Sequence, residues 1–249
     1  MQKALIIVFK LGFIWLFFCS TAIAQQTAPD SILLKNDVVS YFNEAIGKQS
    51  RIYNGKEYEF YHPSIEGSAY FQDATFFTKG SIHYDGLVYH NIPLMYDMHK
   101  DLVVSLFHDG FSKYSLINEQ ITEFGLSGHH FVRVVQDSTN TTLKTGFYDQ
   151  IYQGTLTILV KRSRELKEES NIQELKNIFR VNNRYYLKKD NAYYNVGSKT
   201  AFMKLFKDKK GQLQRVLKDA DISFRKEPER ALVLLATSYD NLSNWYEVN

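Results

Sequence analysis

The chain is poor in residues that staple or sharply interrupt a fold. Its 249 residues include 1 cysteine, 4 prolines and 2 tryptophans. One cysteine cannot form an intramolecular disulfide, so the fold must be held by its own core. At this length, with 44% apolar residues, we expect one sizeable domain, or a domain with an appendage.

Signatures of catalysis are missing as well. Glycines never cluster as a phosphate-cradling loop before a helix, so nucleotide binding has no support. Ser127 lies in Gly125-Leu126-Ser127-Gly128, which lacks the Gly-x-Ser-x-Gly elbow of serine hydrolases. Paired carboxylates are a three-dimensional feature that one sequence cannot reveal. We therefore predict no catalytic residue and no cofactor, and keep an envelope hydrolase as the alternative.

The first 24 residues have the features of a secretory signal peptide. Lys3 and Lys10 form a basic start without acidic residues, and an apolar run follows over residues 11–18. Ala22-Ile23-Ala24 then places small residues at the two positions that a signal peptidase recognises. This pattern predicts cleavage after Ala24 and export to the periplasm, the cell envelope or the medium.

Two other interpretations of this segment are weaker. The apolar stretch over residues 4–18 is shorter than a spanning helix requires, and Lys10 interrupts it. Cys19 would suit a lipoprotein, but the bulky Phe18 stands where a small residue is expected. We predict a mature chain without a transmembrane segment and without disulfides.

Charge is unevenly distributed along the chain. Residues 25–160 hold 9 basic and 15 acidic side chains, whereas residues 161–249 hold 19 basic and 12 acidic ones. The two parts can neutralise each other by docking, or the basic part can face an anionic partner; a solvated surface of mixed charge also fits. Nothing in the pattern indicates nucleic-acid binding.

From about Arg51 to Val196, apolar side chains recur with a period of two. Turn signals separate these runs, which predicts a meander of antiparallel strands, as an open sheet or a barrel-like body. The polar segment 164–176 has Glu and Lys at helical spacing and is interpreted as a surface helix or loop between two groups of strands. The turn signals are Tyr53-Asn54-Gly55, Asp85-Gly86, Asp109-Gly110, Ser127-Gly128, Asn182-Asn183 and Asp190-Asn191.

Helical patterns flank the strands on both sides. A short N-terminal helix is expected over residues 36–47, with Asn36 as its N-cap. After Val196, Ser198 and Asp208 can cap two helices, and Pro228 suits the first turn of a third. The predicted fold class is α+β, mainly β.

This organisation divides the chain into three parts. Residues 1–24 are the signal peptide, residues 25–196 hold the N-terminal helix and the β body, and residues 197–249 form a helical segment packed on that body. Packing is expected because the apolar stripes of these helices cannot be buried by an isolated helix.

The stretch SIHYDGLVYHNI, residues 81–92, predicts a β-hairpin in its own right. With Asp85-Gly86 as a two-residue turn, Ser81 lies opposite His90, and His83 and His90 are diagonal neighbours on the wetter side. The opposite side is predicted to be core. It consists of Ile82, Tyr84, Leu87 and Tyr89.

A second group of polar residues follows this hairpin. On a continuous strand Asp97, His99 and Asp101 would share one face, and a divalent cation could use their atoms. His99-Lys100-Asp101 stands between two apolar runs, residues 92–98 and 102–107, where a hairpin must turn. Turn residues are therefore the simpler interpretation, and we predict no metal. Our candidate ligand or partner face consists of His83, His90, Asp97, His99 and Asp101.

Several stretches resemble a set of exported proteins of Bacteroidota-type bacteria that have no established activity. The resemblance spans nearly all of the chain after residue 24. It implies export, a β-rich body and a basic helical tail, and it supplies no catalytic residues. The stretches include YNGKEYEFYH, GSIHYDGLVYHNIPLMYD, GHHFVRV, GFYDQIYQGTLTILVKRS and the segment from YYLKKDNAYYNVGSKTAF onward.

These features favour a non-catalytic binding or interaction module of the cell envelope. The chain has 17 Tyr and 18 Phe, and aromatic side chains on a rigid sheet offer large contact area at low entropic cost. The expected partner is a small apolar ligand, a glycan or another envelope protein. A deep pocket with two convergent titratable groups would favour the hydrolase instead.

Overall fold

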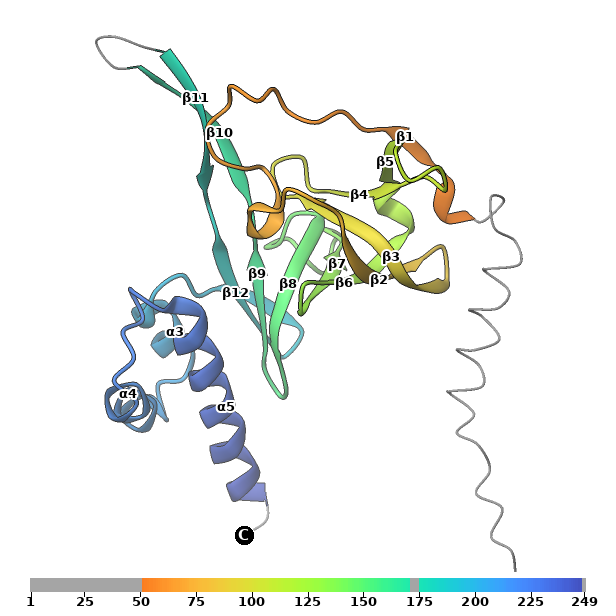
Figure 1. Cartoon of the computed structure of the whole chain (residues 1–249). Coiled ribbons are helices and arrows are strands. Elements are labelled where there is room, and N and C mark those ends of the chain that lie inside the picture. The colour runs from red at the N-terminus through yellow and green to blue at the C-terminus, as the bar shows by residue number, and fades with distance from the viewer. Residues whose placement is uncertain (1–50, 171–174, 248–249) are drawn as a thin grey trace, which may run out of the picture. The chain divides into compact units, whose positions relative to one another are not determined.

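A computed structural model describes residues 51–170 and 175–247 (Figure 1). The fold is mainly β, with antiparallel strands followed by three C-terminal helices, as the sequence predicted. The signal peptide over residues 1–24 and the helix over residues 36–47 lie outside the described residues and stay predictions.

Eleven strands form one antiparallel sheet in the order β1-β5-β4-β3-β2-β6-β7-β8-β9-β12-β13. In that order β1 and β13 are the two edges, so the described strands form an open sheet. The strands are β1 Gly55–Glu57, β2 Thr78–Tyr84, β3 Leu87–Asp97, β4 Leu102–Leu106, β5 Lys113–Leu116, β6 Ile121–Leu126, β7 His129–Val134, β8 Gly146–Gln153, β9 Thr157–Lys161, β12 Arg184–Lys189 and β13 Ala192–Asn195. Short 3-10 turns are η2 Arg51–Tyr53, η3 Phe71–Asp73 and η4 Asn118–Gln120.

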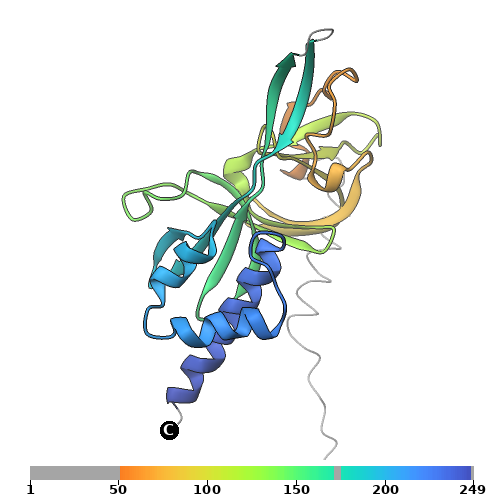
Figure 2. The same ribbon diagram turned by 90° about the vertical axis from the view of Figure 1, so that its left-hand side faces the viewer.

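The sheet rolls over an aromatic core. The rings of Tyr96 on β3 and Phe147 on β8 lie 6.2 Å apart although β2, β6 and β7 stand between these strands in the sheet. Figure 2 shows the strong curvature of the strands around this core. Rolling is required because one face carries large apolar side chains that a flat sheet would leave in water. The buried set includes Ile82, Tyr84, Tyr89, Leu94, Tyr96, Val103, Tyr114, Phe124, Phe131 and Phe147.

The same face of the sheet continues along β8, β9 and β12, where helices cover it. These helices are α3 Lys199–Leu205, α4 Lys210–Asp219 and α5 Pro228–Glu247. Their apolar residues form a second core with strand residues Leu156, Ile158 and Leu187, and its helical members include Phe202, Met203, Phe206, Leu213, Leu217, Leu232 and Leu235. No helix in the described ranges is both long and apolar enough to cross a membrane.

The expected helix starts are mostly correct. Ser198 accepts a hydrogen bond from the Ala201 backbone N–H (3.1 Å) at the start of α3, and α5 begins at Pro228. The predicted Asp208 cap is wrong, because α4 begins at Lys210 with Lys209 in the N-cap position and without a capping side chain.

A buried arginine lies between the two cores. Arg162 follows β9 and is 8% exposed. Its guanidinium donates to Asp149 on β8 through Nε (2.7 Å) and Nη2, and makes two hydrogen bonds to Glu229 on α5 (2.7 and 3.0 Å). Asp149 also lies 2.8 Å from His129 Nδ1, and the Phe71 ring packs against the guanidinium. Arg162 thus connects the rolled sheet to the helices.

The protonation of Arg162 follows from these partners. Burial by itself would lower the pKa of the guanidinium, but its hydrogen bonds to Glu229 and the charges of Asp149 and Glu229 outweigh this effect and hold the pKa above its ordinary value. A buried charge that is paired and hydrogen-bonded in this way is tolerated, whereas an unpaired one is not.

The prediction of a surface helix or loop over residues 164–176 is wrong. This segment contains β10 Arg164–Ser170, which pairs with β11 Leu175–Val181 as a two-stranded ribbon. The ribbon continues the β9–β12 pairing in unchanged register and projects from the sheet (Figure 1). Asn182-Asn183 is therefore a strand-to-strand link and not a reversal. The helical spacing of Glu and Lys in this segment is not evidence of a helix, because both faces of an exposed ribbon accept charged residues.

The hairpin predicted over residues 81–92 has the expected faces. Ile82 pairs with Tyr89, His83 with Val88 and Tyr84 with Leu87, and both turn residues, Asp85 and Gly86, have positive φ. The pairing of Ser81 with His90 is wrong. Gly80 pairs with Ile92 instead, because the register shifts at a bulge where Asn91 adopts a φ of 57°.

Tyr89→Ala should destabilise the protein by about 2 to 4 kcal/mol, because Tyr89 is 3% exposed in the aromatic core. His83→Ala and His90→Ala, on the opposite side of the hairpin, should each cost less than about 1 kcal/mol. Urea unfolding measures the three values. Equal losses would mean that the two faces are assigned wrongly.

Arg162→Ala should cost about 3 to 5 kcal/mol, because it leaves the Asp149 carboxylate buried without its cation. Arg230→Ala is the matched control on α5, where an exposed guanidinium pairs with Glu227, and should cost less than about 1 kcal/mol. Urea unfolding measures the free energy of unfolding of the two variants. A small and equal loss for both would show that Arg162 does not hold the two cores together.

Candidate functional site

The predicted site residues fall into two separate places. His83 is half-buried and His90 exposed on the outer side of the β2–β3 hairpin, and in the described part of the chain neither imidazole has a hydrogen bond or an ion pair. Asp97 stands seven positions beyond His90 on the same strand, a separation of about 23 Å. The structure does not bring the five residues together.

Asp97 acts as an acceptor inside the fold. It is 0% exposed, and its Oδ2 accepts hydrogen bonds from the hydroxyls of Tyr58 (2.7 Å) and Tyr61 (2.8 Å). Its Oδ1 accepts the backbone N–H groups of His99 and Lys100, both at 2.9 Å. Burial and these hydrogen bonds raise the pKa of both tyrosines, so their hydroxyls stay donors. Four donors fully occupy Asp97.

His99 and Asp101 lie in the turn between β3 and β4 and close the rolled sheet. The Nδ1 of His99 lies 2.9 Å from the backbone oxygen of Arg164. Asp101 accepts the Tyr96 hydroxyl (2.5 Å) and pairs with Lys161 on β9 (2.7 Å). Gly146 permits this approach, because a Cβ there would lie 2.2 Å from the Asp101 carboxylate. The turn interpretation is confirmed, and these residues act as a seam.

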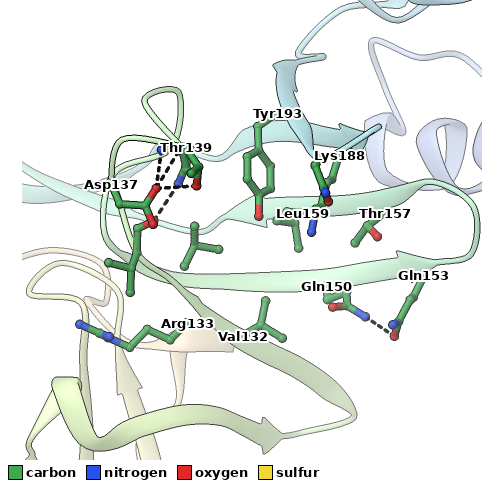
Figure 3. A pocket seen from close by; sticks show the side chains of 14 residues that line it. Val132, Arg133, Asp137, Thr139, Gln150, Gln153, Thr157, Leu159, Lys188 and Tyr193 are labelled. Atoms are coloured by element: carbon green, nitrogen blue, oxygen red, sulfur yellow. Dashed lines mark hydrogen bonds between the residues drawn. The ribbon is translucent and has the colours of Figure 1, made fainter.

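A better site candidate lies on the other face of the sheet, the one that faces away from the helices. It is a hollow of about 620 Å³ over β7, β8, β9, β12 and β13, and we call it the outer hollow (Figure 3). Val132, Val134 and Leu159 form its apolar floor. Its volume is within the range of about 300 to 1,000 Å³ that is usual for small-molecule sites.

A loop held by its own hydrogen bonds forms one wall of this hollow. Asp137 accepts from the Thr139 hydroxyl (2.7 Å) and from the backbone N–H groups of Thr139 (2.8 Å) and Asn140 (2.9 Å). The Asn140 side chain, 7% exposed, bonds the backbone of Val135 and Leu143. The wall is therefore held in place by its own hydrogen bonds.

Amide and hydroxyl groups line the rest of the hollow. Gln150 donates to Gln153 (2.7 Å), and the Thr157 and Asn191 side chains stand nearby. Figure 3 shows the Tyr193 ring between the loop and these strands. The other polar residues in the lining are Arg133, Asp137, Thr139, Asn140 and Lys188. In Figure 3 the Arg133 side chain points away from the hollow, which leaves Lys188 and Asp137 as its charged groups.

The ionisation of this lining does not suit acid–base catalysis. The hydrogen bond from the Thr139 hydroxyl and those from the backbone N–H groups hold the pKa of Asp137 below its ordinary value. Burial raises the pKa of Tyr193, so its hydroxyl stays neutral. A general acid needs a pKa near the working pH, and neither group meets that condition. No His lines the outer hollow.

Sequence reasoning missed the outer hollow. Asp190-Asn191 is one of the predicted turn signals, and the register of its hairpin places Lys188 opposite Tyr193. That pair was the available signal. It could not be interpreted from the sequence because which face of β12 the helices cover is decided only when the chain folds.

No metal centre emerges from the described residues, in which no group of three or more His, Cys, Asp or Glu side chains could hold an ion. Comparison with known proteins found no matching family model, no matching curated protein and no matching solved structure. The role of the outer hollow must therefore be deduced from its own side chains.

The loop that carries Asp137 should keep its hydrogen bonds as the pH falls to about 4. The pKa of Asp137 is lower in the folded protein than in an unfolded chain. The stabilisation that its carboxylate gives the folded loop is therefore complete above the ordinary pKa of Asp, and it is lost only as the pH falls through the lower pKa of the folded protein. NMR shifts of the Thr139 and Asn140 amides during an acid titration measure this. Asp137→Ala is the control without the acceptor, and a titration of these amides above pH 4 would contradict the assignment.

Proposed function

We propose that this protein is an exported, non-catalytic binding protein of the cell envelope, and that the outer hollow binds a carbohydrate. The observation that carries the proposal is the lining of the hollow. An apolar floor and one tyrosine ring stand beside several amide and hydroxyl groups and only two charged ones.

This combination of groups matches the chemistry of a sugar. Each hydroxyl of a sugar both donates and accepts hydrogen bonds, and the side-chain amides of Gln150, Gln153 and Asn191 offer both kinds of partner. The C–H face of a sugar ring is apolar and can lie on the Tyr193 ring or on the floor. Binding also costs little ordering, because the Asp137 loop is already held in place.

The other partners considered for the binding module fit less well. A small apolar ligand would leave the amides of the rim unpaired, which costs free energy at each buried group. A protein partner usually requires a larger surface with a central aromatic or arginine anchor. For a hydrolase, the hollow would need a proton donor, and the Asp137 carboxylate with its depressed pKa does not supply one.

Export supports this role and rests on the first 24 residues. The basic start, the short apolar run and Ala22-Ile23-Ala24 indicate cleavage after Ala24, which would remove Cys19, the only cysteine. The mature protein would then hold its binding face on a sheet without thiols, in a compartment where extracellular glycans are available.

Tyr193→Ala should weaken carbohydrate binding about tenfold, the loss expected for one aromatic contact. The test is a panel of neutral oligosaccharides on a microarray with the mature protein, followed by calorimetric titration of the sugars that bind. The bound sugar should be recovered uncleaved.

Tyr194→Ala is the matched control. Tyr194 is the next residue of β13 and pairs with Leu187, whose side chain lies in the core beneath the helices, so it points to the other face. Its loss should leave binding unchanged. Equal loss in both variants, cleavage of the sugar, or no binding to any member of the panel would overturn the proposal.

A further inference from the structure

A second hollow lies on the same outer face, at the base of the β10–β11 ribbon. It has a volume of about 720 Å³. Five of its lining residues are cations and one is an anion, and we call it the basic hollow. The cations are Lys144, Lys161, Arg164, Lys167 and Arg184, and the anion is Glu165.

Carboxylates neutralise three of these cations. Lys161 pairs with Asp101 (2.7 Å) and Arg164 with Asp73 (2.9 Å). Lys167 stands 3.6 Å from Glu165. In the described part of the chain Lys144 and Arg184 have no carboxylate within salt-bridge distance, so the positive charge of the hollow is concentrated on these two side chains.

The strand register brings two cations together. Arg184 on β12 lies directly opposite Lys161 on β9, so both side chains stand on the same face. Like charges in directly opposite positions destabilise a sheet. Asp101 offsets the positive charge of Lys161, whereas the positive charge of Arg184 is not offset by a described carboxylate.

The surroundings of these cations suit a ligand with oxygen atoms. Tyr148 lies on the floor between them. The Lys161 ammonium stands 5.2 Å from the centre of the Tyr148 ring, and the Tyr148 hydroxyl donates to the backbone oxygen of Lys144 (2.9 Å). Burial is the main cause that raises the pKa of Tyr148, and the charge of Arg184 opposes it. Arg184 is thus close enough to act on this floor electrostatically.

We propose that the basic hollow binds a phosphate group, with Arg184 and Lys144 as the main contacts. The planar guanidinium of Arg184 can donate two parallel hydrogen bonds to a tetrahedral oxyanion, and Lys144 adds a mobile ammonium. The bound charge would also relieve the repulsion between Arg184 and Lys161. The phosphate is that of a soluble ester or of a lipid head group, which share this chemistry.

Titration of the protein with inorganic phosphate, at constant ionic strength with chloride as the replacing anion, tests the site. Backbone NMR shifts should saturate and be confined to the neighbourhood of Lys161, Arg184 and the 142–144 loop. Replacing both contacts, Arg184→Gln with Lys144→Gln, should weaken binding at least about tenfold, as expected for the loss of hydrogen bonds to a charged ligand. Both side chains are exposed, so the variant should fold, which its thermal midpoint verifies.

Arg215→Gln is the control for net charge, since it removes an exposed arginine from α4. It should leave phosphate binding unchanged. Tyr193→Ala should leave it unchanged too, so failure of the carbohydrate proposal and failure of this one are distinguishable. Shifts that never saturate, that spread over the whole surface or that persist unchanged in the double variant would overturn the site.

Vesicles distinguish the two sources of phosphate. The protein is sedimented with phosphatidylcholine vesicles that either contain or lack phosphatidic acid. Sedimentation that needs phosphatidic acid and is lost in the double variant assigns the site to a lipid head group. Saturable binding of inorganic phosphate without sedimentation assigns it to a soluble ester. The absence of both responses rejects the proposal.

Discussion

The pairing of the Arg162 guanidinium with two carboxylates is the interaction that joins the rolled sheet to the C-terminal helices. The guanidinium is buried between the rolled aromatic core and the helix-covered core, and it bonds Asp149 on one side and Glu229 on the other. Burial of a charge costs several kcal/mol unless its partners are correctly placed. The position of α5 on the sheet is therefore coupled to the position of β8, and a loosely docked helix would leave a charge unpaired in both cores.

The uneven charge of the sequence has its explanation in the same kind of contact. Basic residues after position 160 pair with acidic residues of the first half at Lys161 with Asp101, Arg162 with Asp149, and Arg164 with Asp73. The distal ribbon adds Lys176 with Glu66. Of the alternatives that the sequence left open, docking of one part on the other accounts for these pairs. Arg184, which has no such partner among the described residues, lines the basic hollow.

The sheet uses its two faces for different purposes. One face forms the two large cores, because it is rolled on itself at one end and covered by helices at the other. The other face keeps a small cluster of buried residues, Val134, Leu143, Tyr148, Leu159 and Tyr186. Leu159 of this cluster lines the outer hollow, and Tyr148 and Tyr186 line the basic hollow. One buried cluster therefore underlies both hollows.

Local sequence determined a large part of this protein. Alternation of apolar residues and turn signals such as Asp85-Gly86 gave the antiparallel strands, and Ser198 and Pro228 gave helix starts, because these features depend on neighbours within a few residues. Tertiary structure alone decided the rest. Three features depend on which segments meet across the rolled sheet: the ribbon over residues 164–181, the seam formed by His99 and Asp101, and the outer hollow around Tyr193. A period of two indicates that a strand has two faces. Only the packing of the helices and the curvature of the sheet decide which face is buried and which stays exposed to solvent.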